Sequence, residues 1–295
     1  MRAKLLALVL LLPAAQATAQ AIVRNDENLD SDRPEAWAMD YFAASSLFTG
    51  TGATPALAPG DWNLAVDLAQ VPRLDERQQT IGFDGLKRED LNRSPVFGRA
   101  RAWIGLPAGW VGELGYTPPL RLHDTQPRHF VALALSRRLV ERGHYVLSAR
   151  LYGQHGAVEG DITCPARLAG VDDPARNPYG CQAPSRDVAS LNDYGIGLTS
   201  SWSARGWQAY LETTLLRTET QVQVDALTFD ARDRSRLVAH DLLATVAAGV
   251  RRDLGAHFDW GAEVLFVPLR VRRAADAPSE RDDFVGVRLQ LRYRP

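Results

Sequence analysis

The strongest constraint on the fold is an alternation of apolar and polar side chains that recurs from residue 61 to the end of the chain. In WNLAVDLAQ (62–70), every second residue from Trp62 to Leu68 is a large apolar one, and Asn63 and Asp67 stand between them. A period of two predicts a β-strand with one apolar and one polar face. The pattern predicts ten strands, at residues 62–70, 99–105, 110–116, 128–140, 143–154, 191–203, 206–219, 237–252, 256–270 and 283–294.

The connections between these strands alternate in length. Tight turns follow the second, fourth, sixth and eighth strands, whereas long polar links follow the others. No stretch reaches about 18 continuous apolar residues, so membrane-spanning helices are excluded. Short turns at one end, long loops at the other and an even strand count predict an all-β fold, a ten-stranded antiparallel transmembrane β-barrel with a short N-terminal α-helix. A soluble β-sandwich is the alternative.

Aromatic residues provide a second indication of a membrane barrel, because they gather near the short turns. Amphipathic rings are favoured at the depth of the lipid headgroups, where they form a girdle. The predicted girdle consists of Trp62, Trp110, Tyr145, Trp202, Trp207, Phe258, Trp260 and Tyr293.

The last segment, FVGVRLQLRYRP (284–295), alternates apolar and polar residues up to Tyr293. It resembles the C-terminal strand by which bacterial outer-membrane barrels are recognised for assembly. With the strand and turn pattern, residues 61–295 resemble this class of protein as a whole. The resemblance implies outer-membrane lipid and the barrel-assembly machinery as partners. The chain departs from the family pattern at its end, where Arg294 and Pro295 follow the aromatic residue.

The first twenty residues resemble a secretory signal peptide. Arg2 and Lys4 precede an apolar run at residues 5–12, and small residues follow at 17–19. This order predicts export and cleavage, and with the barrel pattern it predicts an outer-membrane location. A membrane anchor is the alternative, but the apolar run is shorter than the roughly 20 residues that a spanning helix needs.

Residues 21–60 are predicted to form a periplasmic N-terminal segment that precedes the barrel of residues 61–295. Asp32 and Glu35 resemble a capping box, and Pro34 fits a first helical turn. An amphipathic helix is expected at about 34–48. It could plug the barrel, lie on the inner leaflet, bind a partner or simply cover apolar surface. Its predicted face comprises Trp37, Tyr41, Ala44 and Phe48.

The polar faces of the strands predict a lumen with charges of both signs. Ten strands give a narrow barrel, so the lumen is expected to hold interlocked ion pairs that only stabilise it, or else a path for a small solute. The predicted lumen charges are Asp67, Arg99, Arg101, Glu113, Arg138, Arg150, Glu212, Asp241, Arg251, Asp259, Glu263, Arg288 and Arg292.

Cys164 and Cys181 both lie in the longest predicted loop. In an exported chain a close pair of cysteines predicts a disulfide bond. No histidine stands near them at zinc spacing, so no metal site is predicted, and no cofactor motif is present. Lys and Arg total 34 against 35 Asp and Glu, which gives no indication of nucleic-acid binding.

Catalytic motifs are absent except for one weak grouping. His155, Asp193, His240 and Asp241 are all expected near the outer ends of strands, where a histidine and an aspartate could activate water. Outer-membrane proteases of the omptin type also have ten strands, but their signature is missing here and no residue role is carried over. The open hypotheses are a narrow channel or small-solute barrel, a surface scaffold whose loops bind a partner, and a hydrolase at the rim.

Overall fold

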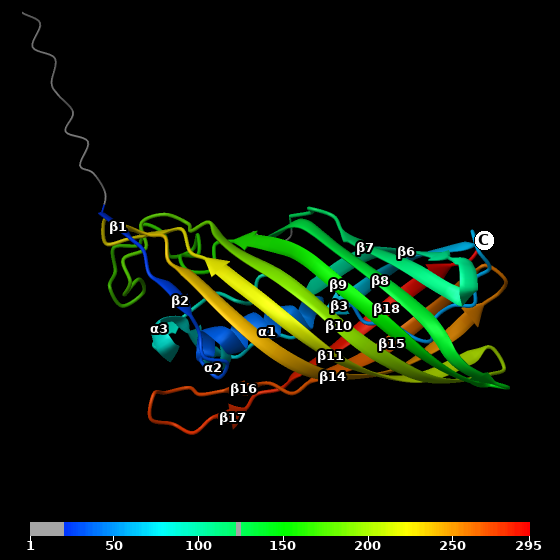
Figure 1. Cartoon of the computed structure of the whole chain (residues 1–295). Coiled ribbons are helices and arrows are strands. Elements are labelled where there is room, and N and C mark those ends of the chain that lie inside the picture. The colour runs from blue at the N-terminus through cyan, green and yellow to red at the C-terminus, as the bar shows by residue number, and fades with distance from the viewer. Residues whose placement is uncertain (1–20, 122–124) are drawn as a thin grey trace, which may run out of the picture.

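The computed structural model describes residues 21–121 and 125–295, so the predicted signal peptide lies outside the described residues. The chain forms a closed antiparallel barrel of ten strands (Figure 1). The barrel strands are β3 (Trp62–Gln70), β6 (Val96–Gly105), β7 (Trp110–Thr117), β8 (Gln126–Arg142), β9 (Tyr145–Gly160), β10 (Asp187–Ala204), β11 (Trp207–Gln223), β14 (Arg236–Leu254), β15 (Phe258–Val267) and β18 (Phe284–Tyr293). All ten predicted strands are confirmed, with ends shifted by a few residues.

The barrel closes because the last strand pairs with the first. β18 pairs antiparallel to β3, with Leu289 opposite Leu68. Each of the remaining barrel pairings joins two barrel strands that follow one another in the sequence. The expected alternation is present: Leu64 and Val66 are exposed on the outer face, whereas Asn63 is buried inside. The sheet is therefore apolar on its outer face and polar on its inner face.

The wall is taller on one side. β8, β9, β10, β11 and β14 have 16 to 19 residues, whereas the other five strands have 8 to 10. One end of the barrel carries the tight turns, including a 3-10 turn η1 (Pro107–Gly109) and glycines with positive φ at Gly143 and Gly255. At this short-turn end Trp202 packs on His144, and Phe258 packs on Tyr293, as the predicted girdle requires.

The opposite, long-loop end is covered by a folded cap, which we define as residues 21–33, 71–95, 161–186, 224–235 and 268–283. Its small elements are β1 (Ala21–Val23), β2 (Asp26–Asn28), α2 (Glu76–Gln79), β4 (Thr80–Ile81), α3 (Gly82–Gly85), β5 (Lys87–Arg88), β12 (Ala226–Thr228), β13 (Ala231–Asp233), β16 (Arg270–Val271) and β17 (Glu280–Arg281). The predicted Cys164–Cys181 disulfide is present in the cap, with the two Cα atoms 5.5 Å apart. Each of these cap elements is shorter than five residues, too short for sequence periodicity to reveal it.

Helix α1 (Pro34–Ser46) lies inside the barrel, which Figure 1 shows as the blue helix surrounded by strands. The preceding strand β2 pairs in parallel with the start of β14, at the long-loop end. At the other end of the segment, the amide of Gly60 donates to the carbonyl of Gly105 beside a tight turn. Residues 21–60 therefore run through the barrel from the cap to the short-turn end. The sequence predicts a helix on the short-turn side, with insertion into the barrel as a plug as one alternative; the helix is inserted, but it enters from the long-loop end.

The helix is also not amphipathic in the sense predicted. Trp37 and Tyr41 are buried, but so are Ala36 and Met39 on other faces of α1. Glu35 and Asp40 of the same helix are buried too, so α1 is enclosed on all sides by the barrel and the cap. Within the described residues, no helix has the length and apolar character needed to cross a membrane.

Candidate functional site: a lumen filled by the N-terminal segment

The lumen holds the chain's own backbone. Beyond α1, residues 47–54 continue through the barrel, and we call residues 44–54 the plug segment. Carbonyl groups at the end of a helix lack intrahelical partners and carry partial negative charge, which favours cations. Six arginines of the wall donate to carbonyls of the plug segment: Arg288 to Ala44 (3.1 Å) and Leu47 (2.6 Å), Arg99 to Ser46 (2.9 Å), Arg150 to Phe48 (2.6 Å), Arg101 to Thr49, Arg251 to Thr51 (2.7 Å) and Arg138 to Thr54 (2.8 Å).

Arg101, Arg150 and Arg251 are also held from the wall side by carboxylates, whereas Arg99 donates to the amide oxygen of Gln154. Arg101 lies 3.0 Å from Asp67 and 2.5 Å from Glu113, and Arg150 lies 3.0 Å from the second oxygen of Glu113. Nearer the short-turn end, Asp259 pairs with Arg251. Asp67 is half-buried and the other members of these pairs are buried. Removing one partner of a buried pair is strongly destabilising, so these three guanidinium groups are held both by the wall and by the plug segment.

Two further carboxylates bind the plug segment directly. The amide of Gly50 donates to both oxygens of Glu212, at 3.0 and 2.9 Å. The hydroxyl of Thr49 donates to Glu263 at 2.7 Å, and Tyr210 donates to the other oxygen of Glu263 at 3.0 Å. A Cβ atom at position 50 would stand 2.8 Å from Glu212, so this close approach requires glycine. Thr49 and Gly50 belong to the TGTG run of residues 49–52.

Phe48 is the apolar centre of the plug segment and is almost fully buried. The guanidinium carbons of Arg101 and Arg150 each lie 4.3 Å from its ring centroid, and that of Arg99 lies 4.9 Å away. Cations above an aromatic face are attracted by the ring quadrupole, more strongly where water is excluded. Phe48 thus holds together three arginines from two strands, β6 and β9.

The structure places the thirteen predicted lumen charges on the inner side of the wall. Nine are buried: Arg99, Arg101, Glu113, Arg150, Glu212, Arg251, Asp259, Glu263 and Arg288. Four are half-buried: Asp67, Arg138, Asp241 and Arg292. Of the predicted helix face, Trp37 donates to the carbonyl of Asp282 and Tyr41 to that of Pro72, so these two rings anchor α1.

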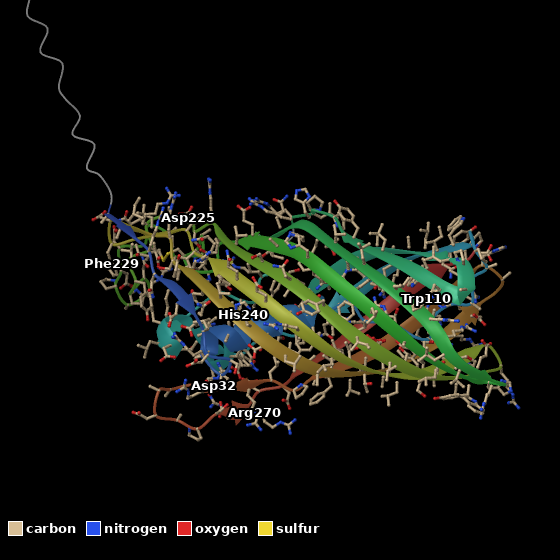
Figure 2. All side chains as sticks on the ribbon, viewed as in Figure 1. Asp32, Trp110, Asp225, Phe229, His240 and Arg270 are labelled. Carbon is tan, nitrogen blue, oxygen red and sulfur yellow. A yellow bond between two sulfur atoms is a disulfide. The ribbon has the colours of Figure 1, made fainter. Side chains whose placement is uncertain are left out.

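The four residues considered for catalysis do not come together. His155 and His240 are exposed on the outer face, whereas Asp193 is buried on the inner face. His155 lies 2.5 Å from Asn192, and His240 lies 3.8 Å from Glu219 (Figure 2 labels His240). Asp193 accepts a hydrogen bond from Gln154 instead. The barrel wall separates the histidines from that aspartate, so these residues form no joint site for activating water.

Asp241 also faces inward, where it meets Asp40 of helix α1. The side chain of Asp40 is itself buried, so the two carboxyl groups lie beside each other inside the barrel. Among residues 21–121 and 125–295, no group of three or more His, Cys, Asp or Glu side chains is placed to hold a metal ion.

A cavity of about 800 Å³ opens at the short-turn end. Its lining includes Arg138, Trp207 and Arg292 of the wall, and Ala53 and Pro55 of the N-terminal chain. The amide of Ala53 donates to Gln208 at 3.3 Å, which fixes the chain at the inner limit of this cavity. The cavity is therefore a vestibule bounded by the end of the plug segment.

The outer surface of the barrel decides the class of protein. Val66, Leu289 and Leu291 are each more than half exposed on neighbouring strands, where a barrel in water would carry polar groups. The fold is that of a bacterial outer-membrane β-barrel. In such a barrel the exposed apolar band faces lipid, and the aromatic residues of the short-turn end lie at headgroup depth.

Several solved structures of outer-membrane proteins are similar to this chain at low identity. No protein-family model matches the chain, and no curated protein matches it. Among solved structures, the outer membrane protease OmpT of Escherichia coli is similar with a TM-score of 0.35 and 10% identity, over 80% of this chain and 94% of OmpT. The toluene transporter TodX of Pseudomonas putida is similar with a TM-score of 0.34 and 10% identity, over 85% of this chain and 74% of TodX. The Ail protein of Yersinia pestis has a TM-score of 0.23 and 11% identity, over 80% of this chain and 98% of Ail. No residue role is carried from these proteins to this outer-membrane barrel.

Proposed function

We propose that this protein is a closed outer-membrane barrel that displays the cap as a rigid binding surface outside the cell. The observation that carries the proposal is the plug segment, whose carbonyls are bound by six arginines of the wall. A lumen filled in this way leaves the barrel as a scaffold. Function then belongs to the long-loop end, which faces outward in outer-membrane barrels.

The organisation of the cap supports this proposal. The ammonium of Lys87 donates to the carbonyl of Thr163 at 2.7 Å, and Tyr179 donates to the carbonyl of Leu86 at 3.1 Å. These bonds join two loops that are far apart in sequence. The disulfide closes the second of these loops, and constraint of this kind favours a preorganised surface.

The proposal includes the partners and location predicted from the sequence. Residues 1–20 direct export, outer-membrane lipid surrounds the barrel, and β18 is the strand that the assembly machinery recognises. The first twenty residues are removed, so the mature chain begins next to β1 in the cap. The N-terminus of the mature chain then lies outside the cell. The first barrel strand, β3, nevertheless begins at the opposite, short-turn end of the barrel.

Cysteine labelling of intact cells tests the display. The two native cysteines are paired in the disulfide, so Ile22→Cys introduces one reactive thiol at an exposed position of β1. We expect a membrane-impermeant maleimide to label this variant on intact cells. The matched control is Leu254→Cys, exposed at the short-turn end, which should react only after the outer membrane is permeabilised. Labelling of Ile22→Cys only after permeabilisation would contradict the proposed orientation.

A gated passage for a small solute is the second candidate function. The vestibule at the short-turn end favours it, because displacement of the plug segment would connect that cavity to the lumen. Planar-bilayer recordings separate the two functions. We expect the full mature protein to show no sustained openings, whereas Gly50→Val, whose side chain would collide with Glu212, should loosen the plug segment and give measurable current. Sustained openings of the unaltered protein would favour the gated passage over the closed scaffold.

A further inference from the structure

A second cavity, of about 630 Å³, lies in the cap at the long-loop end. Five segments of the chain line it: the link after β7, the end of β9, the disulfide-bonded loop, β12 with the residue before it, and β13. Figure 2 shows Asp225, which lies in its wall, at the cap and far from Trp110 at the short-turn end. We call this cavity the cap cleft.

The cap cleft has an excess of positive charge. Three arginines line it, Arg121, Arg186 and Arg232, together with the carboxylates of Glu159, Asp161 and Asp225. Glu159 is already paired with Arg128, and Asp161 lies 2.8 Å from Arg93; neither of these two arginines lines the cleft. Among the residues that the structure describes at the cleft, Asp225 is then the remaining carboxylate for three lining arginines, so two of these arginines have no carboxylate partner there.

Of the three lining arginines, one binds the carboxylate of Asp225 directly. Arg232 binds it through two parallel hydrogen bonds of 2.6 and 2.7 Å. That hydrogen bonding, together with the charges of Arg234 and Arg186, lowers the pKa of Asp225. Within the described residues, the guanidinium of Arg186 has no hydrogen-bond or ion-pair partner, and that of Arg121 has only a 3.4 Å contact with Gln126. Two arginines at a cleft therefore have donors free for a ligand.

We propose that the cap cleft binds a phosphate group, held by Arg186 and Arg121 with Arg232 at its base. A guanidinium presents its donors in a planar fork that matches the oxygens of phosphate, and several such groups around one cleft are a common means of recognising that anion. The inference rests on the proposed function, because it identifies the chemical class that the displayed cap recognises. The phosphate is carried either by the headgroup of an outer-leaflet glycolipid or by a soluble molecule.

The disulfide gives the cleft a fixed shape. Ala166 follows one cysteine closely and Ala183 the other, and both line the cavity. The amide of Cys164 donates to the hydroxyl of Ser185 at 3.0 Å, which joins the two walls beside the disulfide. Because the backbone amide of Arg186 also donates to the carbonyl of Asp225, the arginine is positioned by main-chain bonds that a side-chain substitution leaves intact.

Calorimetric titration of the full mature protein with inorganic pyrophosphate tests the inference. We expect saturable one-to-one binding that weakens as salt rises, because exposed charges are screened. Arg186→Gln should weaken binding about tenfold or more, as expected for the loss of a charge-assisted hydrogen bond. The matched control is Arg176→Gln, an exposed arginine of the same disulfide-bonded loop that does not line the cleft, and it should bind as the unaltered protein does.

The outcomes separate this inference from the proposed function. No saturable binding, or equal weakening in Arg186→Gln and Arg176→Gln, would overturn the phosphate site without affecting the labelling or conductance results. The same titration in phosphatidylcholine nanodiscs, with and without lipid A, identifies the source. If lipid A blocks pyrophosphate binding, the cleft takes a lipid headgroup phosphate; if binding is unchanged, it takes a soluble phosphorylated molecule.

Discussion

Replacing Phe48 with leucine isolates the contribution of the three guanidinium groups around its ring. Leucine preserves most of the buried apolar volume, and hydrophobic swaps of similar volume usually cost less than about 1.5 kcal/mol. It removes, however, the cation–π contacts with Arg101, Arg150 and Arg99, at 4.3, 4.3 and 4.9 Å. At roughly 0.5–2 kcal/mol each, the three contacts predict a total loss of about 1.5–6 kcal/mol in the free energy of unfolding.

The assay is equilibrium urea unfolding of the protein in detergent micelles, followed by tryptophan fluorescence. Phe229→Leu is the matched control, because Phe229 is 67% exposed in the cap and its loss should change the free energy by less than about 0.5 kcal/mol. A loss below about 1 kcal/mol for Phe48→Leu would refute the reasoning. It would mean that Arg101 and Arg150 are held by Glu113 and the plug carbonyls alone.

Two further predictions concern the cap and the wall. Burial raises the pKa of Glu89 to about 7, partly opposed by Lys87, so the folded protein keeps a proton that the unfolded chain loses. This contribution is present below about pH 4.5 and is lost as the pH rises to about 7; the urea midpoint should fall over that window, and Glu89→Gln should abolish the fall. Gly249→Ala would bring a Cβ atom to 2.4 Å from the ring of Tyr210 and should cost about 1–3 kcal/mol, whereas Gly153→Ala, with its nearest neighbour at 3.7 Å, should be tolerated. Equal pH dependence in Glu89→Gln, or equal stability of the two glycine variants, would contradict these predictions.

The barrel itself could be predicted from the sequence because its signal is local. Alternation along a strand such as 206–219 needs only neighbouring residues, and the tight turns mark where each hairpin reverses. The cap could not be predicted in the same way. Its strands β12 and β13 have three residues each. β13 pairs with β12 and also with β1, which lies more than 200 positions earlier in the sequence.

The position of the helix was missed for a different reason. The spacing of Trp37, Tyr41 and Phe48 predicts one apolar face, but Glu35, Met39 and Asp40 on the rest of the helix are buried as well. The direction of the chain through the barrel is set by the pairing of β2 with β14, residues 26–28 with 236–238, which no local pattern encodes.

The predicted lumen charges did contain an indication of what fills the barrel. They include seven arginines, each with five donors, against six carboxylates, and a narrow lumen has little water to accept the remaining bonds. Buried donors are almost always satisfied, so an excess of guanidinium donors requires acceptors that are not wall side chains. Main-chain carbonyls can accept these bonds. The N-terminal segment leads directly into the first strand, β3, and is therefore well placed to supply them. An arginine-rich inner face in a narrow barrel therefore favours a lumen occupied by backbone over an open, water-filled one, and here Arg288, Arg150 and Arg251 bind the plug segment on that principle.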